Sequence, residues 1–205
     1  MAKVSTTRSQ HQPRPGRDAH LARIREQIMA SRAQPLGADE QRDLQRIREQ
    51  RKLARDLYWE LAKRWGSLAL VRLGAAEQTH LDTLDTLLDH DGLSDPVAGR
   101  AVGESGDPKF QALHAQLVEV GHRSEMAASQ AGLLVEEMSL SDLAAARART
   151  RRPEIAAVYD DLLRNSRNHL RALFRQMQRF EGEYVPQSLS LSDFEAIVWT
   201  QPEPC

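Results

Sequence analysis

Prolines and apolar residues divide the sequence into long helical segments. Because proline breaks helix interiors, long helices are expected only between prolines. The long proline-free intervals are 36–95, 109–152 and 154–185. In the first interval, apolar residues recur every three or four positions over 44–65 and again over 70–88, on either side of Gly66-Ser67. This spacing predicts two amphipathic helices joined by a tight turn.

A second pair of helices is predicted after a long connection. Residues 89–110 are rich in Gly, Asp, Ser and Pro, which indicates an extended loop rather than a short turn. Ser124 is placed to cap a helix that ends at the arginine-rich segment 147–152. Pro153 suits the first turn of the next helix, which is expected to continue to Phe180.

Three shorter elements flank these four helices. A short helix is expected around 109–120, and an extra amphipathic helix over 20–33. Residues 184–198 form a C-terminal extension, expected to pack on the outside of the long helices. Within it, Ser192 and Glu195 have the spacing of a capping box.

The sequence therefore predicts an all-α protein. Two long hairpins joined by one long crossover are the arrangement of a four-helix bundle. Composition agrees, because aromatic residues make up only 5% of the chain and good helix formers dominate. We expect a basic, largely flexible leader over 1–37, one helical-bundle domain over 38–198, and a tail over 199–205.

Charge and apolar content restrict the class of protein. The net charge of -1 argues against a protein that binds nucleic acid by overall attraction. Residues 1–37 carry seven Lys or Arg and two acids, so a nucleic-acid contact would have to use this leader.

No apolar run suits a signal peptide or a membrane span, which predicts a cytoplasmic protein without a membrane partner. Cys205 is the single cysteine and cannot close an internal disulfide. The sequence is also compatible with a homo-oligomer.

Several polar residues fall on faces that should be buried. Glu77 and His80 are three positions apart, share one helix face, and lie along the leucine stripe of 70–88. His169 lies on the inward series of the last helix. A carboxylate buried without a partner costs several kcal/mol, so these groups should contact one another.

Antiparallel packing places these residues at one depth. Reflection of 166–169 about a turn near residue 152 gives roughly 135–138, which contains Glu136 and Glu137. Reflection of Glu77 and His80 about the turn near residue 66 gives roughly 52–55, and the inward series nearest to that height offers Gln50 or Arg51. Tyr58 and Tyr159 are expected to fill the core.

Five segments carry a resemblance to a known family. They are "REQRKLARDLYWELAKRWG" (48–66), "AEQTHLDTLDTLL" (76–88), "GLLVEEMSLSDL" (132–143), "LLRNSRNHLRALFRQM" (162–177) and "PQSLSLSDFEAI" (186–197). Together they resemble an uncharacterised ferritin-like family, catalogued as domain of unknown function 2202, over residues 39–198. The resemblance implies a ferritin-like bundle with a di-metal centre, and no activity is established for the family.

This chain departs from the family's usual sequence on the first long helix. Family members usually read "REEEKLARD" where this chain has Gln50 and Arg51. Carboxylate-bridged bundles use one Glu from each of two helices and a Glu-x-x-His from each of the other two. This chain has one complete Glu-x-x-His, a Ser-x-x-His that contains His169, and no obvious acid on the first helix at the position that the template would need. Arginine does not deprotonate, so Arg51 would place a fixed cation in the site.

Two functions from different classes follow. The first is a protein that binds iron or manganese through a reduced set of ligands, with an oxidase or peroxidase type of site. The candidate ligands are Glu77, His80, Glu136, Glu137 and His169. The second is a non-catalytic scaffold or interaction protein in which Arg51 has replaced the metal. The sequence shows no motif that names a substrate or a reaction, so whether the chain is an enzyme is left open.

Overall fold

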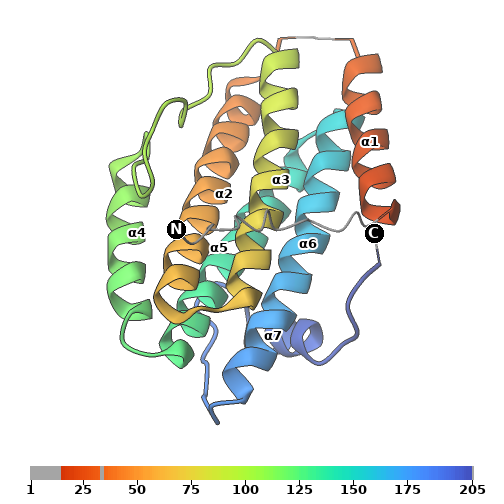
Figure 1. Ribbon diagram of the computed structural model, residues 1–205. Helices are drawn as coiled ribbons and strands as arrows, with labels where there is room; N and C mark the ends of the chain where they lie inside the picture. Colours follow the sequence, from red (N-terminus) through yellow and green to blue (C-terminus); the bar gives the residue numbers. More distant parts are fainter. Residues whose placement is uncertain (1–14, 33–34, 205) are drawn as a thin grey trace, which may run out of the picture.

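The computed structural model describes residues 15–32 and 35–204. Over these ranges the chain forms seven helices and no strand, which confirms the all-α prediction (Figure 1). The helices are α1 (Pro15–Ala30), α2 (Ala38–Trp65), α3 (Leu68–His90), α4 (Pro108–Gly121), α5 (Glu125–Arg149), α6 (Pro153–Gln178) and α7 (Leu191–Val198).

The helices of the two predicted hairpins begin and end at residues that favour helix termini. Gly66 ends α2 in the left-handed conformation (φ 64°, ψ 23°), which glycine adopts without steric cost. Ser67 then caps α3 by accepting a hydrogen bond from the amide of Leu70. Ser124 caps α5 in the same way, and Pro153 lies in the first turn of α6.

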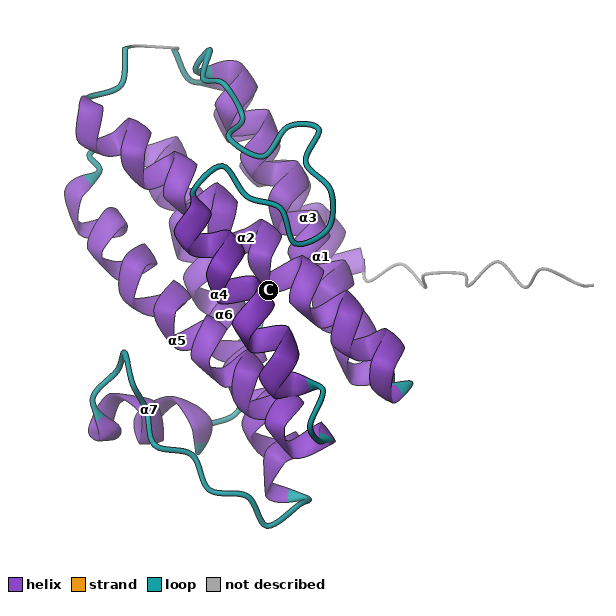
Figure 2. Ribbon diagram, turned by 90° about the vertical axis from the view of Figure 1, so that its left-hand side faces the viewer, coloured by secondary structure: helices purple, strands orange, loops and turns teal. Residues whose placement is uncertain are grey.

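The long helices α2, α3, α5 and α6 lie side by side, and the shorter helices cover them (Figures 1 and 2). Helix α4, which belongs to the crossover, packs against α2 and α5. Helix α1 contacts α3 and α6, and α7 contacts α6. No helix within the described ranges has both the length and the apolar character needed to cross a bilayer.

The apolar core consists of two clusters, separated along the long helices by a polar layer. On α2, Ile47 belongs to one cluster and Ala54 to the other; on α3, Leu84 and Leu73 are divided in the same way. The buried polar side chains that face inward between these positions include Arg51, Glu77, His80, Glu136, Ser166 and His169. The layer is therefore enclosed by apolar side chains above and below.

Charged residues on the outer face of α2 hold the crossover in place. Their side chains are almost fully buried, so each needs a partner. The pairs are Arg48 with the carboxylate of Asp95 (2.9 Å), Glu49 with the amide of Asp107 (3.0 Å), Lys52 with the carbonyl of Ala101 (2.6 Å) and Asp56 with the amide of Gly103 (3.0 Å). The long connection is thus fixed to α2 by polar contacts.

Within the leader predicted over 1–37, residues 15–30 are helical. They form α1, whose Ile24 and Ile28 are buried in one of the apolar clusters. His20 of this helix lies 2.9 Å from Asp161 of α6. The predicted extra helix therefore exists but begins five residues earlier than expected. Residues 1–14, part of the proposed nucleic-acid contact, lie outside the described residues.

The C-terminal extension packs on α6 as expected, but its helix is capped differently. Ser190, not Ser192, is the N-cap of α7 and accepts a hydrogen bond from the amide of Asp193 (3.1 Å). The predicted Ser192–Glu195 capping box is therefore wrong. Serines occur at positions 188, 190 and 192, and Ser192 lies within the first turn of the helix rather than before it.

Beyond α7, the tail is bound along α6. Asn168 donates to the carbonyl of Glu203 (2.9 Å) and accepts from its amide (2.8 Å). Arg167 donates two hydrogen bonds to the Glu203 carboxylate (2.7 and 2.5 Å), and Arg171 donates a third (3.0 Å). The hydrogen bonds from Arg167 outweigh partial burial and lower the pKa of Glu203 to about 2.

We expect Glu203→Gln to reduce the free energy of unfolding by about 1 kcal/mol at pH 7, after allowance for solvent screening of this part-exposed pair. Because the pKa of Glu203 is lower in the folded protein, its contribution is present above about pH 4.5 and is lost as the pH falls toward about 2. Urea unfolding across this range measures the effect. Glu195→Gln, on an exposed position of α7, is the control and should show no such pH dependence.

Candidate functional site

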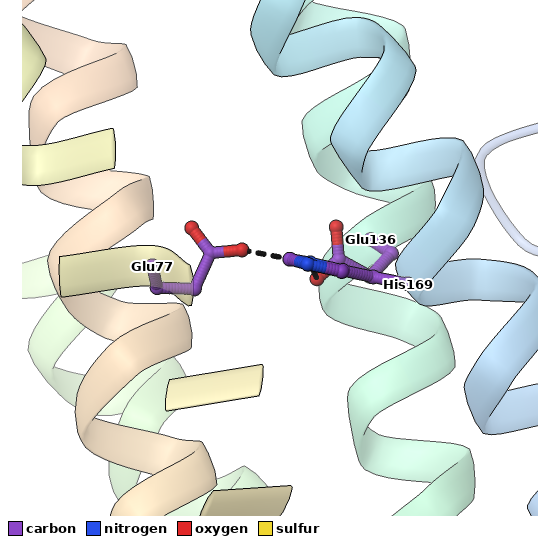
Figure 3. Close-up of side chains that lie close together, drawn as sticks. All are labelled: Glu77, Glu136 and His169. Atoms are coloured by element: carbon purple, nitrogen blue, oxygen red, sulfur yellow. Dashed lines mark hydrogen bonds and ion pairs between the residues drawn. The ribbon is translucent and has the colours of Figure 1, made fainter. Parts of the chain in front are cut away.

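Three ligand-type side chains converge inside the molecule. Glu77 of α3, Glu136 of α5 and His169 of α6 point toward one another (Figure 3). One ligand atom from each lies within 4.8 Å of the others. Nδ1 of His169 is 2.9 Å from Oε1 of Glu77 and 3.2 Å from Oε1 of Glu136. Both glutamates are fully buried and His169 is 7% exposed.

His80 lies beside this group. Its Nδ1 is 3.1 Å from Oε2 of Glu77, and its ring centroid is 5.9 Å from that of His169. The other ring nitrogen, Nε2, is buried and has no hydrogen-bond partner among the described residues. The predicted Glu-x-x-His pair therefore shares one helix face and points into the core, as its spacing indicated.

Arg51 of α2 completes the layer. Its side chain is fully buried, and Nη1 donates to Oε2 of Glu77 (3.3 Å) and to Oγ of Ser166 (3.1 Å). Ser166 stands where a second Glu-x-x-His would place its glutamate, three residues before His169. The two positions that differ from the four-glutamate template are thus in direct contact with each other.

The structure decides between the alternatives that the sequence left open. Glu137 does not join the group: its carboxylate accepts hydrogen bonds from the amides of Gln187 (2.7 Å) and Ser188 (2.9 Å) and so binds the C-terminal extension. Gln50 likewise turns away and donates to Asp142. Glu136 and Arg51 are therefore the inward members of their pairs.

Tyr58 contacts the site directly, although filling of the core was the favoured prediction. Its hydroxyl donates to Oε1 of Glu136 (2.6 Å), and the side chain is fully buried. The sequence contained a clue, because Tyr58 follows Arg51 by seven residues, two helical turns, on the same face of α2. Tyr159 behaves as expected: it lies in an apolar cluster, and its buried hydroxyl has no partner among the described residues.

Burial and the neighbouring charges have opposite effects on the pKa values of Glu77 and His169. Burial alone would raise the pKa of Glu77, but Arg51, His80 and His169 together hold it well below its usual value. Burial alone would lower the pKa of His169, but the carboxylates of Glu136 and Glu77 raise it to about 9. Burial, with the same two carboxylates, raises the pKa of Tyr58 well above its usual value, so Tyr58 remains a hydrogen-bond donor.

The sequence as a whole matches a family. Residues 40–201 match the family described as an uncharacterized protein domain, DUF2202. The chain belongs to the DUF2202 family. This agrees with the resemblance seen in the sequence over residues 39–198.

This chain is also similar to the uncharacterized protein MJ0754 of Methanocaldococcus jannaschii. It is 34% identical over 178 residues, which cover 87% of this chain and 96% of the relative. The crystal structure of hypothetical protein MJ0754 from Methanococcus jannaschii DSM 2661 is similar to this DUF2202 chain with a TM-score of 0.82, covering 85% of this chain and 99% of that one. Neither name states an activity, so any functional conclusion depends on the site itself.

Tyr58→Phe should reduce the free energy of unfolding by roughly 2 kcal/mol, because a buried carboxylate loses a short hydrogen bond from its donor. Urea unfolding at pH 7 measures this change. Tyr159→Phe is a matched control, since it removes a buried hydroxyl that has no partner among the described residues, and it should change stability by less than about 0.5 kcal/mol or increase it. Equal losses in the two variants would contradict the assigned role of Tyr58.

Proposed function

We propose that this chain is a ferritin-like protein that binds one divalent transition-metal ion, iron or manganese, between Glu77, Glu136 and His169. The observation that carries this proposal is the convergence of three buried donor atoms from three helices within 4.8 Å. Carboxylates and imidazole are a ligand set that suits these metals. Helices of a bundle that project Glu and Glu-x-x-His side chains inward are the known framework for such sites.

The geometry of the donors fits an ion. Three ligands at about 2.1 Å from a metal lie roughly 3 to 3.5 Å from one another. The 2.9 and 3.2 Å separations around Nδ1 of His169 are close to this range. In addition, Oε2 of Glu136 and Nε2 of His80 are buried without a hydrogen-bond partner among the described residues. A cation beside them would remove the cost of leaving such groups unsatisfied.

Charge favours one ion over two. The di-metal template supplies four carboxylates, whereas this layer contains two carboxylates and the guanidinium of Arg51. One divalent ion neutralises Glu77 and Glu136, and a second would leave three uncompensated positive charges in the core. Such a charge is far too costly at a buried site. We therefore propose a mononuclear site with a smaller ligand set.

The residues of the chain define what the site does around an ion. Tyr58 holds one oxygen of Glu136, Arg51 holds one oxygen of Glu77, and the two apolar clusters keep bulk water out. When bound, iron or manganese supplies Lewis-acid or redox chemistry. No feature of the site selects a substrate, so the proposal is limited to metal binding.

A second candidate function is a metal-free scaffold, and the same charges favour it. Arg51 together with a protonated His169 balances the carboxylates of Glu77 and Glu136 without any ion. In that case the layer would be a structural salt-bridge network, and the exposed surfaces would bind partners. Purified protein that holds less than about one metal per four chains after loading with iron or manganese would favour this candidate.

Glu136→Gln should weaken metal binding by more than the roughly 10- to 100-fold that loss of an outer partner of a metal ligand costs. Metal titrations of the full chain, combined with thermal unfolding, provide the measurement, because an ion that binds only the folded state raises the unfolding temperature. Glu137→Gln is the matched control on the neighbouring residue. It should lower stability by detaching residues 187–188 while leaving metal affinity unchanged.

Arg51→Glu should increase metal occupancy, because it replaces a buried cation beside the ligands with a carboxylate. Elemental analysis of protein purified and loaded in parallel with wild type tests this expectation. Occupancy that does not rise would show that Arg51 does not limit metal binding. Circular dichroism verifies that the variant remains helical.

A further inference from the structure

One edge of the buried Arg51 guanidinium has no hydrogen-bond acceptor in the part of the chain that the structure describes. Arg51 is fully buried, and its two hydrogen bonds, to Glu77 and Ser166, both come from Nη1. Nε and Nη2 are buried as well, and neither has a hydrogen-bond partner among the described residues. Charged donors buried without an acceptor cost more than the roughly 1–3 kcal/mol of a neutral group.

Elsewhere in the chain, the same edge of arginine holds a carboxylate. In three arginines, Nε and Nη2 bind both oxygens of one acid, although all three side chains are more exposed than that of Arg51. The pairs are Arg48 with Asp95 (3.2 and 2.9 Å), Arg149 with Asp43 (2.9 and 2.7 Å) and Arg167 with Glu203 (2.7 and 2.5 Å). Of these four arginines, the most deeply buried one has no acid on this edge.

We propose that the Nε/Nη2 edge of Arg51 binds a small planar oxyanion, a monocarboxylate or bicarbonate, together with the metal ion. Two parallel N–H groups match the two oxygens of a carboxylate or bicarbonate. The ligand must be small, because Arg51 lies in the packed interior between two apolar clusters. This inference rests on the proposed function, since it describes what accompanies the ion.

Charge explains why the two ligands would bind together. Without an ion, the carboxylates of Glu77 and Glu136 surround the guanidinium and repel any further anion. With an ion bound and the histidines acting as neutral ligands, the two carboxylates cancel the metal charge, and the charge of Arg51 is left over. One oxyanion on Arg51 makes the buried group neutral. Each ligand therefore favours the binding of the other, and by linkage the effect is reciprocal.

Titration of the full-length chain with Co²⁺ tests the inference, because visible absorption reports the ligands of this ion directly. The titration is performed in buffer freed of carbon dioxide, then with added formate and, separately, with added bicarbonate. We expect either anion to raise Co²⁺ affinity about 5- to 150-fold, the usual range of coupling between two sites. Comparison of the formate titration with the bicarbonate titration shows which of the two anions the site prefers. Chloride at the same ionic strength should have no effect.

Arg51→Lys is the informative variant, because it keeps the positive charge and removes the two parallel N–H donors of Nε and Nη2. The effect of formate and bicarbonate should disappear in it. Arg46→Lys, a half-exposed position on the same helix, should retain the full effect. If Arg51→Lys does not fold, as judged by circular dichroism, the contrast between formate and chloride in wild type still tests whether the site takes a planar oxyanion.

The possible results separate this inference from the proposed function. Co²⁺ binding that is unchanged by formate and bicarbonate would overturn the inference and leave the metal site standing. Equal enhancement in wild type and in Arg51→Lys would show that the anion does not bind to the edge of Arg51. Absence of Co²⁺ binding under every condition would overturn the metal site and the oxyanion site together.

Discussion

The pairing of ionisable groups inside the helical core is the constraint on which this structure depends. Each of the four long helices contributes a buried charged or imidazole side chain to one layer: Arg51, Glu77, Glu136 and His169. Burial of any one of them alone would cost several kcal/mol, a large part of the 5–15 kcal/mol that keeps a typical domain folded. The helices must therefore adopt the heights and rotations that bring these groups together.

Arg51 gives this layer its particular character. In a carboxylate-rich bundle, repulsion among the acids is relieved by bound metal ions. Here part of that relief comes from a permanent cation on α2, which contacts both Glu77 and Ser166. The replacement of two carboxylate positions by Arg51 and Ser166 keeps the layer polar and lowers its negative charge. The layer therefore has less carboxylate repulsion to offset than a four-carboxylate layer would have.

One short segment of α2 performs two separate tasks. Arg48, Lys52 and Asp56 project outward and fix the crossover through buried polar contacts, whereas Arg51 and Tyr58 project into the core. The helical repeat of 3.6 residues separates these two sets onto different faces. The charged run "REQRKLARD" therefore fixes the path of the chain between the hairpins as well as one wall of the site.

The sequence by itself determined the helical architecture and the depth of the site. Helix ends depend on local chemistry, as at Gly66, Ser124 and Pro153, and antiparallel pairing fixes heights by simple counting along the chain. For this reason the convergence of Glu77 with His169 was predictable.

Only the tertiary structure decided which side chains face inward. Glu136 and Glu137 differ by about 100° around the helix axis, and the rotation of the helix that packing selects decides which of them faces inward. The docking of α1, the role of Tyr58 and the binding of Glu203 to α6 likewise depend on surfaces that form only after the long helices have packed. Local sequence fixes position along a helix, whereas rotation about its axis is set by all of its neighbours at once.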